Sequence, residues 1–175
     1  MVSVGMTAGR ASRKQRIADL YATHATSAMR LCLLLEDDPA AAEDLLHDAF
    51  AKVIGRLDAL REEQAFGGYL RRTIVNLHTS KLRRRRLERA FLRKEAALAI
   101  AASEPTGAAE ASDVLKVLSG LPPRQRAAIF FRFYEDLSER DVGKALGCST
   151  SAAKATLQRA MSSLREHPEV KNARR

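Results

Sequence analysis

The spacing of apolar residues constrains this chain most, because it follows a helical repeat along nearly all of the 175 residues. Apolar side chains recur every three or four positions, which places them on one face of a helix. No stretch alternates apolar and polar residues as a half-buried strand does. The pattern predicts helices over about 13–35, 39–57 and 65–95, with further helices after 112, so the expected fold class is all-α. The residues expected to face inward in the first three helices are Ile17, Leu20, Tyr21, Ala28, Leu31, Cys32, Leu35, Leu45, Leu46, Ala49, Phe50, Val53, Leu57, Phe66, Leu70, Ile74 and Leu77.

Turn-forming residues divide the chain into two parts. Between 96 and 112 the sequence is rich in small residues and is interrupted by Pro105 and Gly107, which is typical of a linker. We therefore expect two small helical domains, at 13–95 and 113–167, joined by a flexible linker at 96–112.

The second domain has the spacing of a helix-turn-helix over residues 138–165. Ser138 and Asp141 form a capping pair at the start of a short helix. Gly143 is small enough for a close helix crossing, and Gly147 suits a turn that requires a positive φ. The polar residues left on the outer face of the following helix are Ser149, Thr150, Ser151, Lys154, Gln158 and Arg159. Such a face can enter the major groove of DNA, although an ordinary helical hairpin also uses glycine turns.

The positive charge is concentrated in one segment. The formal net charge is +9, and residues 71–94 hold ten Lys or Arg and one acid, Glu88. Arg83 to Arg86 are consecutive, so they point to all sides of a helix and repel one another unless a polyanion neutralises them. Nucleic acid is the polyanion that fits such a segment best. The alternative is a solvated helix face, or a helix end whose dipole favours cations.

An acidic segment lies upstream, where residues 36–48 hold six acids and no Lys or Arg. Within it, Asp44 and His47 have a spacing that occurs in metal-binding helices. His24 and His78, on other predicted helices, lack the matching carboxylate spacing that a helical metal site needs. We therefore expect no metal site and no cofactor.

Several classes of protein are disfavoured by absent motifs. The sequence contains no nucleotide-binding loop, zinc-protease motif or nucleophile elbow, so we expect no enzyme activity of its own. The apolar run Leu31–Leu35 is far too short to span a membrane, so we expect no membrane insertion. Cys32 and Cys148 form no CxxC pair, and Cys32 is expected in the core, although Cys148 leaves a redox role open. No signal peptide is recognisable, and a cytoplasmic location is expected.

Three segments resemble the extracytoplasmic-function sigma factors of the sigma-70 family. These segments are AEDLLHDAF at 42–50, FGGYLRRTIVNLHTSKLRRRR at 66–86, and the stretch that runs from LPPRQR through GCSTSAAKATLQRA to SSLR at 121–165. They occur in the order and spacing of the family. The residues within the motifs are most similar to those of a group common in actinobacteria. The resemblance covers roughly residues 15–166.

The resemblance implies partners for each part of the chain. Region two of the family binds the clamp helices of RNA polymerase core and opens the promoter −10 element, and region four binds the polymerase flap and recognises the −35 element. Family members are commonly held inactive by an anti-sigma factor, so the resemblance implies such a partner beside promoter DNA.

Candidate site residues follow from the family motifs and the outer faces of the helices. Expected polymerase contacts are Glu43, Asp44, His47 and Asp48. Expected contacts to the −10 region are Tyr69, Asn76, His78, Lys81, Arg83, Arg84, Arg85 and Arg86. Expected contacts to the −35 region are Ser149, Thr150, Ser151, Lys154, Thr156, Gln158 and Arg159. Tyr69 replaces the usual tryptophan of the family, and Ala155 and Thr156 replace frequent Ser and Arg, so the promoter sequence cannot be carried over.

Two other functions remain compatible with the residues alone. A stand-alone helix-turn-helix repressor or activator would use the second domain, but it normally also needs a dimerisation element and a ligand or receiver domain. An RNA-binding protein would use the arginine-rich segment, but the aromatic residues do not form an RNA-stacking motif. Binding to polymerase core would distinguish a sigma factor from both of these alternatives.

Overall fold

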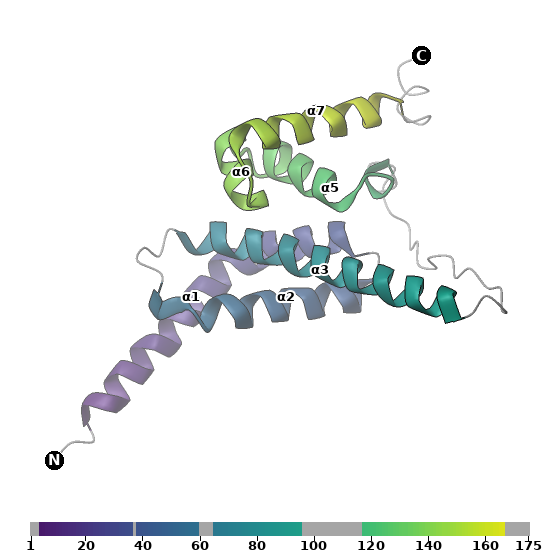
Figure 1. The fold of residues 1–175 in the computed structure, drawn as a ribbon. Coiled ribbons are helices and arrows are strands. Elements are labelled where there is room, and N and C mark those ends of the chain that lie inside the picture. The colour runs from purple at the N-terminus through teal and green to yellow at the C-terminus, as the bar shows by residue number, and fades with distance from the viewer. Residues whose placement is uncertain (1–3, 37, 60–64, 96–116, 167–175) are drawn as a thin grey trace.

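The computed structural model describes residues 4–36, 38–59, 65–95 and 117–166, and every regular element in these ranges is a helix (Figure 1). The α-helices are α1 (Val4–Leu35), α2 (Pro39–Ile54), α3 (Phe66–Glu95), α5 (Pro123–Ile129), α6 (Glu139–Leu146) and α7 (Thr150–Glu166). A 3-10 turn, η1 (Leu57–Ala59), follows α2, and a π-helical turn, η3 (Phe130–Tyr134), continues α5. The all-α class expected from the sequence is confirmed. The expected linker at 96–112 lies outside the described residues.

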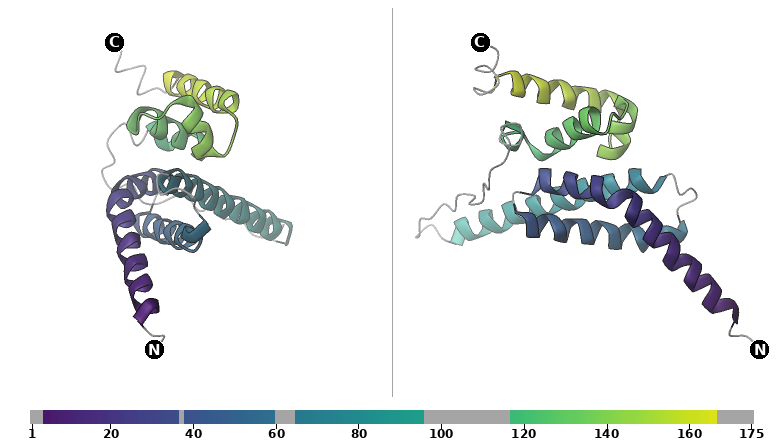
Figure 2. Two further views of the ribbon diagram at one scale, coloured as in Figure 1. Left: turned by 90° about the vertical axis from the view of Figure 1, so that its left-hand side faces the viewer. Right: turned by 180° about the vertical axis from the view of Figure 1, so that it is seen from behind.

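Helices α1, α2 and α3 pack on one another and form what we call the N-terminal bundle (Figures 1 and 2). Asp38 caps α2, because its carboxylate accepts a hydrogen bond from the Ala41 N–H at 2.9 Å, and Pro39 occupies the first helical position. The predicted cap is therefore confirmed. Helix α2 ends at Ile54 instead of near Leu57, and the chain turns so that Leu57 is buried within η1.

Aromatic rings fill the centre of the N-terminal bundle. The Phe50 and Phe66 ring centroids lie 6.0 Å apart, and His24 stacks on Phe66 at 5.4 Å. Tyr21, expected to face inward, is 45% exposed, although its ring still lies 4.8 Å from Phe50. A Cβ atom at Gly67 would lie 3.0 Å from His24 Cε1, so this glycine allows α3 to approach α1 closely. Burial of a phenylalanine such as Phe66 contributes about 2–3 kcal/mol to stability.

Helices α5, α6 and α7 form the C-terminal bundle, with the helix-turn-helix made by α6 and α7. Ser138 caps α6 by accepting from the Asp141 N–H at 3.2 Å. Gly147 ends α6 with φ 66°, a left-handed conformation that glycine adopts at little cost. A Cβ atom at Gly143 would lie 3.0 Å from the Cys148 carbonyl oxygen, which explains the small residue at the crossing. These local predictions are confirmed.

The two bundles lie against each other in this structure (Figure 1). Helix α6 packs against α3, and α5 packs against α1. Arg126 of α5, itself buried, donates from Nη1 to the Leu34 carbonyl near the end of α1 at 2.9 Å. The first helix of the helix-turn-helix is thus next to the first half of α3.

Candidate nucleic-acid interface

The basic second half of α3 extends beyond the packed part of the helix (Figures 1 and 2). Residues 83–86, all arginine, are exposed. Arg84 Nε donates to Glu88 Oε1 one turn further on, at 2.9 Å. Leu87 and Phe91 are exposed as well. The segment is therefore a protruding helix whose cations are accessible to a phosphate backbone.

An exposed face on the first half of α3 carries an aromatic ring, a cation and an amide. Tyr69 is 53% exposed, and Asn76, two turns further along the helix, is exposed too. Arg72 lies between them at helical spacing and is also exposed. The sequence-based list omitted Arg72, although its spacing from Tyr69 and Asn76 was visible. Together the three residues provide a stacking surface, a charge and a hydrogen-bonding group on one side of the helix.

A buried charge cluster joins the end of α1 to α3. Glu36 Oε1 lies 2.9 Å from Lys81 Nζ and 3.3 Å from His78 Nδ1, and the Glu36 side chain is 6% exposed. Burial alone would raise the pKa of Glu36, but hydrogen bonds from His78 and Lys81 and their charges lower it to about 2. The cluster therefore holds a carboxylate in the charged state inside the bundle.

This cluster changes the interpretation of two sequence-predicted residues. His78 is 3% exposed, so its position does not fit the expected contact to DNA. Lys81 is half-buried and directs its ammonium group to Glu36. Glu36 belongs to the acidic segment at 36–48, yet its side chain is buried in the protein. The structure therefore narrows the accessible −10 candidates to Tyr69, Asn76, Arg83, Arg84, Arg85 and Arg86.

The start of α7 presents a polar, accessible surface. The exposed members of the predicted set are Ser149, Thr150, Ser151, Lys154, Gln158 and Arg159. Ser149 also stabilises the helix start, since its hydroxyl accepts from the Ala152 N–H at 3.2 Å. Thr156 differs from the others because it is half-buried and donates to the Ala152 carbonyl at 2.8 Å. Figure 1 shows α7 on the side of the C-terminal bundle that faces away from α3.

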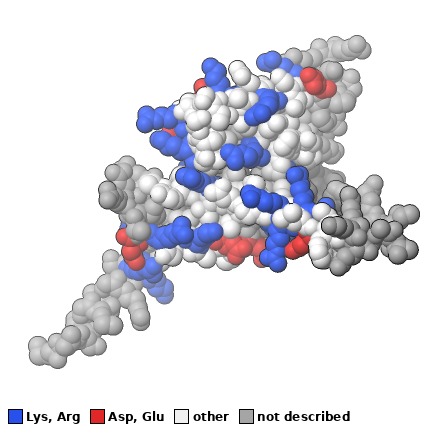
Figure 3. All heavy atoms as spheres, in the orientation of Figure 1, with Lys and Arg blue, Asp and Glu red and all other residues white. Residues whose placement is uncertain are grey.

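The acidic residues of α2 are accessible on one side of that helix. Glu43, Asp44, His47 and Asp48 are exposed, while the apolar residues between them are buried. In Figure 3 the acidic side chains gather along the lower edge, where α2 lies. Among the described residues, no group of three or more His, Cys, Asp or Glu side chains is arranged to hold a metal ion.

The two cysteines have different surroundings. Cys32 is buried, as expected, and burial together with the Glu36 carboxylate raises its thiol pKa to about 12. A thiol with such a pKa is a poor nucleophile and a poor metal ligand at neutral pH. Cys148, in the turn before α7, is half-buried.

These features define an all-helical protein with two surfaces suited to nucleic acid, one on α3 and one on α7. Comparison with family models matches the chain to "Sigma-70 region 2" over residues 20–88 and to "Sigma-70, region 4" over residues 111–164. The RNA polymerase sigma-E factor of Streptomyces coelicolor is 34% identical over 146 residues, which are 82% of this chain and 81% of that protein. The protein of the same name from Streptomyces avermitilis is 32% identical over 152 residues, covering 86% and 83%.

The chain therefore belongs to the sigma-70 family of RNA polymerase sigma factors, within its extracytoplasmic-function group. As a sigma factor it directs polymerase to promoters and takes part in transcription initiation. Both family models fall on the bundles described above, with α1–α3 in region 2 and α5–α7 in region 4.

A solved structure supports the same fold. The sigma factor RpoE from Bartonella quintana, determined in complex with the anti-sigma factor NepR, superposes with a TM-score of 0.65 at 23% identity. The match covers 87% of this chain and 94% of that one. Within the described residues, none of the helices combines the length and apolar character that crossing a bilayer requires.

Proposed function

We propose that α3 carries the −10 interface of this sigma factor. Exposure of Tyr69, Arg72 and Asn76 on one face is the observation that supports it best. Opening DNA requires a base to leave the stack and to be held by aromatic and polar groups, which these three residues offer. The exposed cations at 83–86 then neutralise the neighbouring phosphates.

Helix α7 carries the proposed −35 interface. In helix-turn-helix proteins the N-terminal residues of the second helix contact base edges in the major groove. Lys154 and Arg159 suit phosphate or guanine, and Gln158 suits adenine. All three are exposed on α7. Ser149, Thr150 and Ser151 lie at the helix start, where they reach the backbone, while Thr156 supports the helix and makes no direct contact.

The proposed polymerase contact is the acidic face of α2, formed by Glu43, Asp44, His47 and Asp48. The family resemblance assigns this stretch to the clamp helices of polymerase core. It assigns the C-terminal bundle, which matches region four, to the polymerase flap. Accessibility of all four side chains supports the assignment. The bond-forming chemistry of transcription belongs to polymerase, so the chain acts as a non-enzymatic subunit in the cytoplasm.

The domains proposed for these functions are 13–95 and 113–167, with a linker at 96–112. An anti-sigma factor is a proposed further partner. The family resemblance supports it, and the Bartonella sigma factor that shares this fold was determined with such a protein bound.

A charge-neutralising variant of α2 tests the polymerase contact. Asp44→Asn/Asp48→Asn should weaken binding to bacterial polymerase core by about tenfold or more, since charge pairs at an interface steer and hold the partner. Asp58→Asn is the matched control, because Asp58 is an exposed acid in η1, outside this face. Fluorescence anisotropy measures the affinity of each variant and of the wild-type chain for polymerase core. Equal affinities for the double variant and the wild-type chain would remove α2 from the interface.

A further inference from the structure

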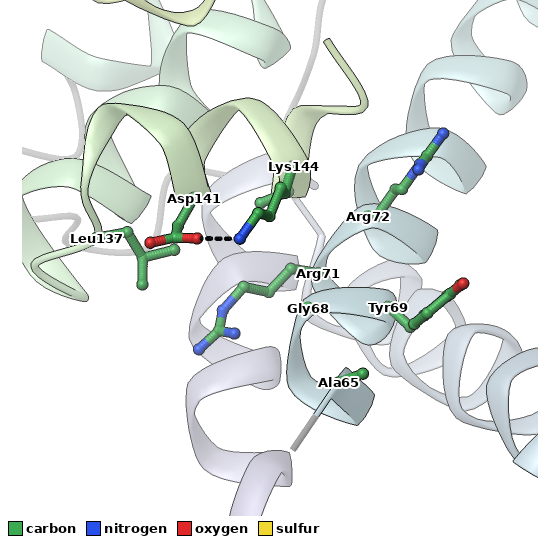
Figure 4. A pocket seen from close by; sticks show the side chains of 9 residues that line it. Ala65, Gly68, Tyr69, Arg71, Arg72, Leu137, Asp141 and Lys144 are labelled. Atoms are coloured by element: carbon green, nitrogen blue, oxygen red, sulfur yellow. Dashed lines mark hydrogen bonds and ion pairs between the residues drawn. The ribbon is translucent and has the colours of Figure 1, made fainter. Parts of the chain in front are cut away.

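Helix α3 is held by apolar packing over its first half only. It packs there against α1, α2 and α6, and its buried large apolar residues are Phe66, Leu70 and Ile74. Figure 4 shows Tyr69 and Arg72 on the side of α3 away from the Asp141–Lys144 ion pair of α6. Packing therefore fixes the backbone of the proposed −10 face (Tyr69, Arg72 and Asn76), while the face itself stays accessible.

Beyond Val75 the apolar packing of α3 ends. Of the described residues 76–91, His78 alone is buried, and residues 83–91 are all exposed. Because helices in proteins owe most of their stability and placement to tertiary packing, this half of α3 needs another attachment to keep a fixed direction. The arginine run at 83–86 lies in this half.

The buried cluster of Glu36, His78 and Lys81 provides the attachment. Glu36 Oε1 accepts a hydrogen bond from Lys81 Nζ at 2.9 Å and lies 3.3 Å from His78 Nδ1. His78 and Lys81 are three positions apart, so both project from the same side of α3. A single carboxylate thus contacts α3 at two points directly before the arginine run.

Glu36 is itself fixed in the fold. Its N–H donates to the Cys32 carbonyl at 2.8 Å, so its backbone continues α1, and Asp38 caps α2 soon after. Hydrogen bonds from His78 and Lys81 keep the pKa of Glu36 low despite burial, so the carboxylate is charged at neutral pH. Charge-assisted hydrogen bonds are shorter and stronger than neutral ones. The direction of the second half of α3 therefore depends on one charged group on α1.

We propose that Glu36 is a positioning residue for promoter opening. Through Lys81 and His78 it holds the arginine run at a fixed place relative to the −10 face of α3. The inference rests on the proposed function of α3, and it gives Lys81 a role in orienting the helix instead of contacting a phosphate. Loss of the attachment should slow DNA opening more than it weakens DNA binding, because exposed arginines still find phosphates but no longer place the strand correctly.

Opening kinetics test the proposal on a promoter that the wild-type chain selects from a genomic library. With polymerase core and 2-aminopurine in the −10 element, Glu36→Gln and Lys81→Met should each slow the fluorescence rise by about tenfold. Their affinity for the duplex should fall by less than about twofold. On a template whose −10 region is already unpaired by mismatches, both variants should match the transcript yield of the wild type.

Two variants serve as matched controls. Asp58→Asn and Lys14→Met each remove an exposed charge outside α3, and both should open the duplex at the wild-type rate. Circular dichroism at the assay temperature checks that each chain is folded. Lys81→Met changes a half-buried side chain, so it still tests the proposal if Glu36→Gln fails to fold.

A direct phosphate contact by Lys81 would give a different result. Lys81→Met would then reduce the slope of log K against log salt by about 0.9, in the presence or absence of the Glu36 carboxylate. Positioning predicts an unchanged slope. It also predicts that Glu36→Gln/Lys81→Met opens DNA no more slowly than Glu36→Gln, because both substitutions remove the same contact. A reduced slope, or additive effects on opening, would overturn the role given to Lys81.

Distances between spin labels report the position of the helix without DNA or polymerase. Exposed positions on α2 and α3 accept labels as Lys52→Cys and Ala90→Cys, in a Cys148→Ser background in which Cys32 stays buried. The wild-type chain should give a narrow distance distribution, and Glu36→Gln should give one about twofold broader. Wild-type distances in a folded Glu36→Gln chain would overturn the positioning role.

The template comparison separates failure of this inference from failure of the proposed function. Wild-type opening by both Glu36→Gln and Lys81→Met, or a defect that persists on the unpaired template, overturns positioning by Glu36. Tyr69→Ala tests the −10 face in the same assay and should slow opening, because it removes the stacking ring. If Tyr69→Ala opens the duplex at the wild-type rate, the proposed function of α3 is wrong.

Discussion

At the scale of single residues, the most consequential group is the buried carboxylate of Glu36. Glu36 is the first residue after α1 and binds Lys81 and His78 of α3, so it fixes that helix just before the arginine run. Its folded-state pKa of about 2 lies below the ordinary value of 4.5. Lowering the pKa of an acid on folding means that the charged carboxylate stabilises the fold.

The pH dependence of stability should reveal this carboxylate. The contribution of Glu36 is fully present above about pH 4.5 and is lost as the pH falls from there towards 2. The size of the shift corresponds to roughly 3 kcal/mol. Urea unfolding should therefore show Glu36→Gln less stable than the wild type at neutral pH by roughly 2–4 kcal/mol, with the difference shrinking below pH 4.

Glu43→Gln provides the comparison for that measurement, because Glu43 is an exposed acid on α2. It should leave the free energy of unfolding within about 0.5 kcal/mol of wild type at every pH. A Glu36→Gln chain whose stability parallels the wild type from pH 7 to pH 3 would contradict the account of the cluster.

At the scale of elements, α3 combines two proposed functions in one helix. Its first half is packed and exposes only a narrow face, whereas the second half protrudes and exposes its arginines. In the proposed interface, the packed half positions bases and the protruding half supplies charge to the neighbouring phosphates. Because phosphate contacts release counterions, each contact has a measurable signature in the salt dependence of binding.

The arginine run should determine that salt dependence. Arg83→Ala/Arg84→Ala should reduce the slope of log K against log salt for promoter DNA by about 1.8, close to 0.9 for each lost duplex phosphate contact. Arg13→Ala/Lys14→Ala, which removes two exposed cations from α1, should leave the slope unchanged. Binding titrations between 50 and 300 mM salt measure both slopes. Identical slopes for the two double variants would remove residues 83 and 84 from the DNA contact.

Sequence patterns predicted elements well where their signals are local. The Asp38 cap, the Ser138 cap and the left-handed Gly147 each depend on residues within a few positions, and each is found as expected. The π-helical turn η3 was not foreseen, because nothing in an apolar run distinguishes a wide turn from an ordinary one. The direction of the Glu135 carboxylate depends on this turn, so it could not be predicted from the sequence either.

At the scale of the whole molecule, the missed features are contacts between distant segments. Glu36 and His78 are 42 positions apart, and Ser27 and Glu135 are 108 apart. A sequence pattern identifies a buried face but not which polar residue meets which across it. For this reason the sequence did not indicate that His78, expected to contact DNA, is buried against Glu36. The predictions for exposed residues such as Tyr69 and Asn76 depended only on the helical face.

The two bundles explain how one chain can contact two separate promoter elements. Helix α3 and helix α7 belong to different bundles, and the junction between the bundles combines a shared apolar core with polar contacts such as the one from Arg126 to the Leu34 carbonyl. The two proposed DNA-contacting surfaces therefore lie on separate bundles, as recognition of two promoter elements requires.

Transcription from a pooled genomic promoter library, with bacterial polymerase core and the purified chain, tests the central claim most directly. The account predicts stable co-elution of the chain with core on a sizing column and new, specific start sites that share two sequence elements upstream. It also predicts that Arg83→Ala/Arg84→Ala lowers transcript yield without abolishing co-elution. Failure to bind core, together with specific duplex binding by the chain alone, would contradict it and indicate a helix-turn-helix regulator that acts without polymerase.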